Sequence, residues 1–169
     1  RPPKSRRLRL VFISDLHFGP TTPERCIRSA FDALSQEALD VLVLGGDYVF
    51  LDASPRKLHM LEELVRGVRA TTKLAVLCNH DLWADNLAIE SALKRAQVQI
   101  LSNQALTLPA PFESISVIGL DEPWTGAPCS NSLFSQTDQD TFPIAVCDSP
   151  DLLNLVASHR IPLMLSGIF

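Results

Sequence analysis

The chain has 169 residues, of which 46% are hydrophobic and 20% charged, and its formal net charge is −4 at pH 7. This length suits one domain, because a domain of roughly 150 residues buries about two thirds of its unfolded surface. The composition excludes disordered and fibrous chains, and the acidic balance gives no electrostatic case for nucleic acid. No run of about 18 apolar residues predicts a membrane span. We predict one domain over residues 1–169.

Basic residues crowd the amino-terminal end of the chain, where residues 1–7 are predicted to form a basic tail. Such a tail either touches lipid headgroups or is simply solvated. The four cysteines lack CxxC spacing, which argues against a zinc ribbon or a thioredoxin-type redox pair. We expect the protein in the cytoplasm or at the periphery of a membrane.

Buried strands alternate with amphipathic helices along the first half of the chain. Apolar runs predict strands buried on both faces over residues 8–14, 41–44 and 73–77. Helical spacing of apolar residues predicts helices over residues 23–38, 54–69 and 85–96. Thr22 is expected to cap the first helix, and Ser54 opens the second. The alternation predicts a mostly parallel, doubly wound sheet whose strand carboxyl ends line one edge.

The second half of the chain is predicted to add shorter elements. Strands are expected near residues 98–101, 106–108, 114–119, 144–147 and 161–165, and a helix over residues 149–158. Residues 123–140 are rich in Pro, Ser, Thr, Asn and Asp, which predicts a long surface loop.

Polar residues of metal-ligand type follow three successive strands of the first half. They are Asp15 and His17 after the first, Asp47 after the second, and Asn79 with His80 after the third. Carboxylate, imidazole and amide oxygen suit Mn²⁺, Fe or Zn²⁺, and a carboxylate can bridge two ions. Singly, each group could be a turn or a helix cap, but their coincidence at three strand ends favours a metal site.

Two ions about 3.5–4 Å apart would activate a bridging water for attack on a phosphoryl group. Asp47 is the natural bridging ligand. His80 could protonate the leaving oxygen as a general acid, and Asp81 could orient its imidazole.

Three motifs carry a resemblance to a known family: Asp-Leu-His-Phe-Gly at 15–19, Gly-Gly-Asp-Tyr-Val at 45–49 and Asn-His-Asp at 79–81. The chain resembles the calcineurin-like metallophosphoesterases through them. Residues 48–49, 81–83 and 119–126 also resemble a bacterial branch of cell-wall-associated and UDP-diacylglucosamine pyrophosphatase-like enzymes.

The resemblance implies a four-layer α-β-β-α sandwich with a dinuclear site. It implies that Asp15 and His17 bind one ion, Asp47 bridges, Asn79 binds the other ion, and His80 donates a proton. Cys78 stands where the family usually has Gly, and this replacement would strain a turn that needs positive φ. Cys78 is either a thiolate ligand or a buried, inert thiol.

Two further departures concern metal ligands. Asp148 stands where the family typically has a metal-binding His, and it is either a ligand or a helix-cap residue. The family's Gly-His-x-His would begin at Gly167, but Ile168 replaces the first His and the chain ends at Phe169. We therefore expect a C-terminally incomplete version of the fold, arising from truncation, processing or degeneration.

The predicted function is hydrolysis of phosphate monoesters, diesters or pyrophosphate bonds with two divalent ions (Mn²⁺, Fe or Zn²⁺), or with only one. Expected substrates are small phosphate esters, nucleotide-sugars or lipid headgroups rather than nucleic acid. The alternative is a non-catalytic scaffold on the same fold that binds a protein partner. His59 and His159 are expected to be structural, and Trp83 and Trp124 either wall the cleft or pack in the core or rim.

Overall fold

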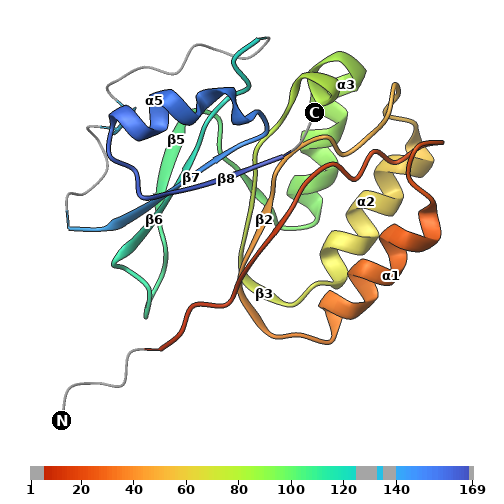
Figure 1. The fold of residues 1–169 in the computed structure, drawn as a ribbon. Helices are drawn as coiled ribbons and strands as arrows, with labels where there is room; N and C mark the ends of the chain where they lie inside the picture. Colours follow the sequence, from red (N-terminus) through yellow and green to blue (C-terminus); the bar gives the residue numbers. More distant parts are fainter. Residues whose placement is uncertain (1–5, 125–132, 135–139, 168–169) are drawn as a thin grey trace.

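The computed structural model describes residues 6–124, 133–134 and 140–167. In these residues, eight strands form two sheets of four. Three long helices lie beside one sheet and a shorter helix beside the other (Figure 1). This arrangement confirms the mixed α/β class and the four-layer sandwich that the family resemblance implies.

The first sheet is entirely parallel and has the order β1-β2-β3-β4. Its strands are β1 (Leu10–Ile13), β2 (Leu39–Leu44), β3 (Ala70–Ala75) and β4 (Gln99–Ile100). The predicted doubly wound order is wrong, because the strand order of such a sheet reverses at a switch point and this one never does. Right-handed crossovers then place all the connecting helices on one face and leave the other face free.

Three helices connect these strands: α1 (Glu24–Ser35), α2 (Pro55–Gly67) and α3 (Asn79–Arg95). The predicted Thr22 cap is wrong, because Pro23 occupies the N-cap position of α1 and makes no side-chain cap bond. Helix α3 begins six residues before the predicted position. It is interrupted at Asp85, whose φ of 179° and ψ of 87° are not helical. The Asp85 carboxylate accepts the Ala88 N–H at 3.0 Å and so restarts the helix at the predicted position.

The second sheet has the order β5-β6-β7-β8, with β5 and β6 antiparallel and the other pairs parallel. Its strands are β5 (Gln104–Thr107), β6 (Ile115–Gly119), β7 (Phe142–Cys147) and β8 (Leu163–Ser166). The 3₁₀-helix η1 (Pro150–Leu152) and helix α5 (Leu153–Ser158) together fill the predicted helix of residues 149–158.

Three apolar clusters separate the four layers. Strand β2 shows the division, because its side chains alternate between two faces. Leu42 and Leu44 pack with the helices α1 to α3, whereas Val41 and Val43 pack with the second sheet. The third cluster joins the outer face of the second sheet to α5. Strand β2 is fully buried as predicted, but the edge strand β1 is only partly buried because it pairs on one side alone.

The predicted tail and surface loop lie largely outside the described residues, which exclude 1–5, 125–132 and 135–139. Within the described part of the tail, Arg6 is exposed and forms an ion pair with Asp40 at 3.3 Å. Within the loop range, Leu133 and Phe134 are buried in the cluster beside α5. Among the described helices, none has the length and apolar character needed to cross a bilayer.

Replacing a side chain between the first sheet and its helices should be costly. Leu42→Ala removes a completely buried side chain, so we expect it to lower the free energy of unfolding by about 2–5 kcal/mol. Leu87→Ala is the control, because the Leu87 side chain is 70% exposed. Urea unfolding of both variants measures the difference, and equal stability of the two would contradict the four-layer packing.

Candidate metal centre

The polar residues predicted from the sequence gather at one edge of the sandwich. Asp15 and His17 follow β1, Asp47 follows β2, Asn79 and His80 begin α3 directly after the β3 segment, and Asp148 follows β7. Five of these six residues line one cleft of about 390 Å³, and both sheets contribute to it. Asp15 lies beside the cleft, close to Gly167 at the end of β8.

The backbone at these strand ends takes an uncommon conformation. Asp15, His17 and Asp47 all have positive φ, at 58°, 44° and 55°. The two turns are also joined to each other, because the His17 N–H donates to the Asp47 carbonyl at 2.8 Å. Non-glycine residues with positive φ are rare and tend to cluster at functional sites.

Asp47 lies at the centre of the site and is 4% exposed. One carboxylate oxygen, Oδ2, is 3.2 Å from His17 Nε2, and that same nitrogen is 3.9 Å from Asp15 Oδ1. The other oxygen, Oδ1, is 2.9 Å from His80 Nδ1. The two imidazole rings meet edge to face with centroids 5.7 Å apart. One oxygen of Asp47 thus faces His17 and the other faces His80.

Asp148 brings a further carboxylate to the site from the second sheet. A Cβ atom placed on Gly167 would lie 3.0 Å from both Asp148 Oδ1 and Asp15 Oδ2, so a larger residue here would crowd the two carboxylates. Asp148 Oδ1 is buried and has no hydrogen-bond partner in the described part of the chain. Burial, followed by the charges of Asp47 and Asp15, raises the pKa of Asp148 to about 8.

The helix-cap interpretation of Asp148 is wrong. Ser149 occupies the N-cap position of η1, and its hydroxyl accepts the Asp151 N–H at 3.2 Å. Asp148 is left facing the cleft.

The donors fit a divalent cation. Asp15, His17 and Asp47 place one ligand atom each within 4.8 Å of one another, and so do Asp47, Cys78 and His80. Crowded carboxylates with a buried, unpartnered oxygen stay ionised only beside a positive charge, and otherwise take up a proton. The two groups share Asp47, the residue predicted to bridge two ions.

Asp81 has a different position from the one predicted. It is completely buried, and its carboxylate accepts the backbone N–H groups of Asp47, Tyr48 and Cys78 at 3.0, 3.0 and 3.2 Å. Burial raises its pKa to about 6. In the described structure, the carboxylate in contact with the His80 imidazole is that of Asp47. The predicted orienting role of Asp81 is therefore wrong, and Asp81 instead ties the β2 turn to the start of α3.

Cys78 occupies its position without the predicted strain. Its φ of −116° and ψ of −179° are extended, so the glycine of related sequences is not required here by backbone conformation. The Sγ atom contacts Asp47 Oδ1 and accepts the Asp47 N–H at 3.1 Å. Burial and neighbouring carboxylates raise the pKa of the thiol.

The remaining predicted residues lie at the rim or away from the site. Trp83 packs edge-on against His80, with centroids 5.5 Å apart, and Trp124 lines the cleft; both are mostly exposed, which excludes core packing. His59 is exposed on α2, and His159 stacks on Phe134.

Glu122 is a buried acid of the cleft that the sequence reasoning does not single out. It accepts the Trp124 N–H at 2.9 Å and so holds the turn that carries this ring. The signal that could have revealed it is its place just after the strand 114–119, because Glu122 follows β6 as the other polar residues follow their strands.

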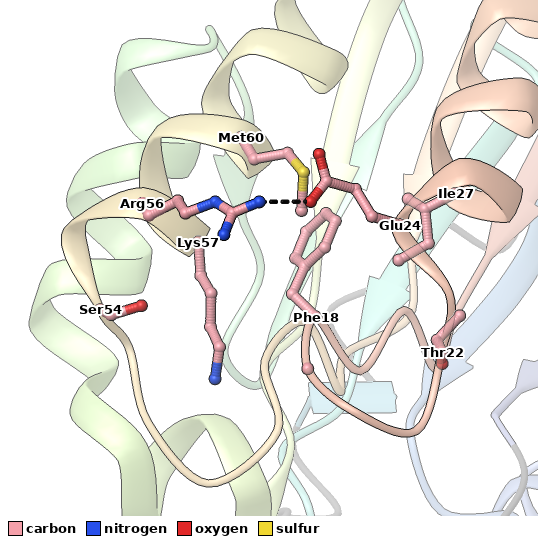
Figure 2. Close-up of a pocket in the computed structure, with 9 residues that line it drawn as sticks. Phe18, Thr22, Glu24, Ile27, Ser54, Arg56, Lys57 and Met60 are labelled. Atoms are coloured by element: carbon pink, nitrogen blue, oxygen red, sulfur yellow. Dashed lines mark hydrogen bonds and ion pairs between the residues drawn. The ribbon is translucent and has the colours of Figure 1, made fainter.

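A second cavity, of about 260 Å³, lies between the amino-terminal ends of α1 and α2. Figure 2 shows Arg56 reaching across it to Glu24, with the apolar side chains of Met60 and Phe18 on either side of this contact. The other cation of its lining, Lys57, is bound to the Asp52 carboxylate. Both cations of this lining are therefore paired with carboxylates. The cleft between the sheets differs, because there the Asp148 Oδ1 atom has no partner among the described residues.

Two sheets packed face to face, with metal-type donors at their common edge, are the arrangement that the resemblance to metallophosphoesterases implies. Among solved structures, the chain is similar to the NAD nucleotidase (NadN) of Haemophilus influenzae, with a TM-score of 0.57 and 13% identity. That likeness covers 95% of this chain and 38% of the other, and it shows the fold.

Curated relatives point to the same class. The chain is 26% identical over 162 residues to the phosphodiesterase YaeI of Escherichia coli strain K12, which covers 94% of this chain and 59% of that protein. It is 26% identical over 107 residues to an uncharacterized metallophosphoesterase of Aquifex aeolicus strain VF5, covering 63% of this chain and 40% of that protein. No protein-family model matches the chain. The comparisons confirm the resemblance to metallophosphoesterases, whereas the finer bacterial branch stays a prediction.

The crowded carboxylates predict an unusual dependence of stability on pH in the ion-free protein. The pKa of Asp148 is raised to about 8 in the folded state, whereas an unfolded Asp titrates near 3.8. Between these values the folded state holds the extra proton, so stability falls as pH rises. Asp81, whose pKa is raised to about 6, acts in the same direction. With chelator present, we expect a lower Tm at about pH 8 than at about pH 5.

Asp148→Asn should reduce this fall in Tm, because the amide does not titrate. The control is Asp151→Asn, which alters an exposed carboxylate nearby and should keep the wild-type fall. Thermal unfolding followed by circular dichroism measures all three proteins. A wild-type fall that Asp148→Asn leaves unchanged would show that Asp148 is not the group responsible.

Proposed function

We propose that this protein is a metal-dependent hydrolase of phosphate mono- or diester or pyrophosphate bonds. The observation that carries the proposal is the position of Asp47, whose two oxygens face His17 on one side and His80 on the other. Similarity to a phosphodiesterase and to a metallophosphoesterase supports the same reaction class.

In this proposal, the polar residues around Asp47 form two sets of ligands. Asp15 and His17 would hold one ion and Asn79 the other, with Asp47 bridging, and Asp148 would complete the set from the second sheet. The ions would be Mn²⁺, Fe or Zn²⁺, and would supply an activated water together with charge stabilisation of the phosphoryl oxygens. The buried, unpartnered oxygen of Asp148 supports its place among the ligands.

His80 is the proposed proton donor to the leaving oxygen. Its side chain is 39% exposed and lines the cleft, so it can reach a bound substrate. The Asp47 carboxylate at Nδ1 holds the ring from one side and Trp83 packs against it from the other. Contacts on both sides restrict the imidazole to a narrow range of orientations, as a positioned general acid requires.

The proposed substrate is a small phosphate ester, such as a nucleotide-sugar or a lipid headgroup, rather than nucleic acid. The exposed indole of Trp124 at the cleft can stack against a nucleoside base or an apolar group. The acidic lining, which includes Glu122 and Asp151, opposes the binding of a long phosphate backbone.

Asp47→Asn tests the metal chemistry. We expect wild-type protein loaded with Mn²⁺ to retain metal and to hydrolyse bis(p-nitrophenyl) phosphate. Asp47→Asn should lose both, because an amide bridges two cations poorly. Metal content by mass spectrometry and release of nitrophenolate measure the two effects. Asp32→Asn, at an exposed position on α1, is the control and should match wild type. Absence of both metal and turnover in wild type would support the scaffold alternative instead.

His80→Ala tests the proton donor. With a poor leaving group, such as an alkyl alcohol, we expect kcat to fall by about 10²–10⁴-fold, since general acid catalysis contributes this much. With p-nitrophenol, which leaves without a proton, the loss should be much smaller. The matched control is His59→Ala, which removes an exposed imidazole on α2. Equal losses with both leaving groups would rule out proton donation by His80.

A further inference from the structure

Cys78 is the residue of the site whose chemistry the motifs leave unassigned. It is completely buried, yet its thiol faces the ligand Asp47 rather than an apolar neighbour. The Sγ atom contacts the same oxygen, Oδ1, that lies 2.9 Å from His80 Nδ1. The sulfur, the carboxylate oxygen and the imidazole nitrogen lie within 4.8 Å of one another, so the sulfur and the oxygen are close enough to bind one cation beside the imidazole.

We propose that Cys78 is a thiolate ligand of the ion on the Oδ1 side of Asp47, adding sulfur to the oxygens of Asp47 and Asn79. The inference rests on the proposed function, because it assumes that the site holds metal. His80 keeps the role of proton donor at the edge of this ion. When the ion binds, the S–H bond breaks, the metal–sulfur bond forms and the proton passes to solvent.

The position of the sulfur supports a ligand. Cys78 lies at the point where the chain leaves β3 and enters α3, next to Asn79. The Asp47 N–H donates to Sγ at 3.1 Å, which holds the sulfur against the turn that carries Asp47. On its other side, the sulfur contacts Asp47 Oδ1, so a cation bound to that oxygen would lie within reach of the sulfur.

The competing interpretation is that the neutral thiol only donates a hydrogen bond to Asp47. Serine separates the two possibilities, because its hydroxyl can replace that hydrogen bond but is a much harder ligand than a thiolate. A sulfur ligand also changes the choice of metal, since thiolates favour Zn²⁺ and Co²⁺ over Mn²⁺ and Mg²⁺. The site should therefore prefer thiophilic ions.

Cobalt substitution tests the proposal directly. Purified, reduced protein is titrated with Co²⁺, and the near-ultraviolet sulfur-to-cobalt charge-transfer absorption is recorded. We expect the band in wild type and in the control Cys26→Ser, which alters an exposed thiol, and its loss in Cys78→Ser. By calorimetry, Cys78→Ser should weaken Zn²⁺ binding by more than about tenfold. Mn²⁺ binding should change much less.

A second variant shows whether loss of the band reflects loss of the thiol rather than misfolding. Cys78→Gly introduces the residue found in the related family, and the extended backbone at this position accepts it. It should remain folded by circular dichroism and lack the band. Cobalt binding to wild type without the band, or a band that persists in Cys78→Ser, would overturn the Cys78 ligand while leaving the hydrolase proposal standing. Failure of wild type to bind any of these ions would overturn both.

Discussion

The packing of one sheet against the other is the constraint on which the rest of the structure depends. Because the strand order β1-β2-β3-β4 never reverses, the helices occupy one face and the other face must be covered. Val41 and Val43 bury that face against Val117 and Val146. This contact aligns the carboxyl ends of both sheets at one edge. Without it, the donors of the first sheet would face solvent, and Asp148 could not join them.

Asp81 and Asp148 are two acids at this edge whose surroundings give them different roles. Asp81 accepts three backbone N–H groups, so its charge is compensated inside the protein. Asp148 has an oxygen without a partner among the described residues and lies among other acids. Burial raises the pKa of both, yet only Asp148 needs a cation from outside to remain ionised in this position. The same residue type therefore stabilises a turn in one place, and in the other leaves a carboxylate oxygen without a partner in the described part of the chain.

The errors of the sequence interpretation have identifiable physical causes. Alternating strands and helices predict parallel pairing, but strand order depends on long-range packing, so the doubly wound prediction was wrong. The predicted role of Asp81 assumed that sequence neighbours interact, whereas in the helical turn its side chain points back to the β2 end. The strain expected at Cys78 depended on a positive φ that the chain does not adopt there. Each error concerns a property that only neighbours distant in sequence can decide.

The sequence by itself determined the local elements and the chemistry of the strand ends. The apolar runs set the strands, and the position of Asp15, His17, Asp47 and Asn79 directly after them followed from residue type and spacing. Tertiary structure alone decided that two sheets face each other and that Asp148 turns into the cleft. It also placed a thiol against the central carboxylate. A sequence pattern describes one segment of the chain at a time. These features arise where burial brings segments more than 30 residues apart into contact, as it does for Asp47 and Cys78.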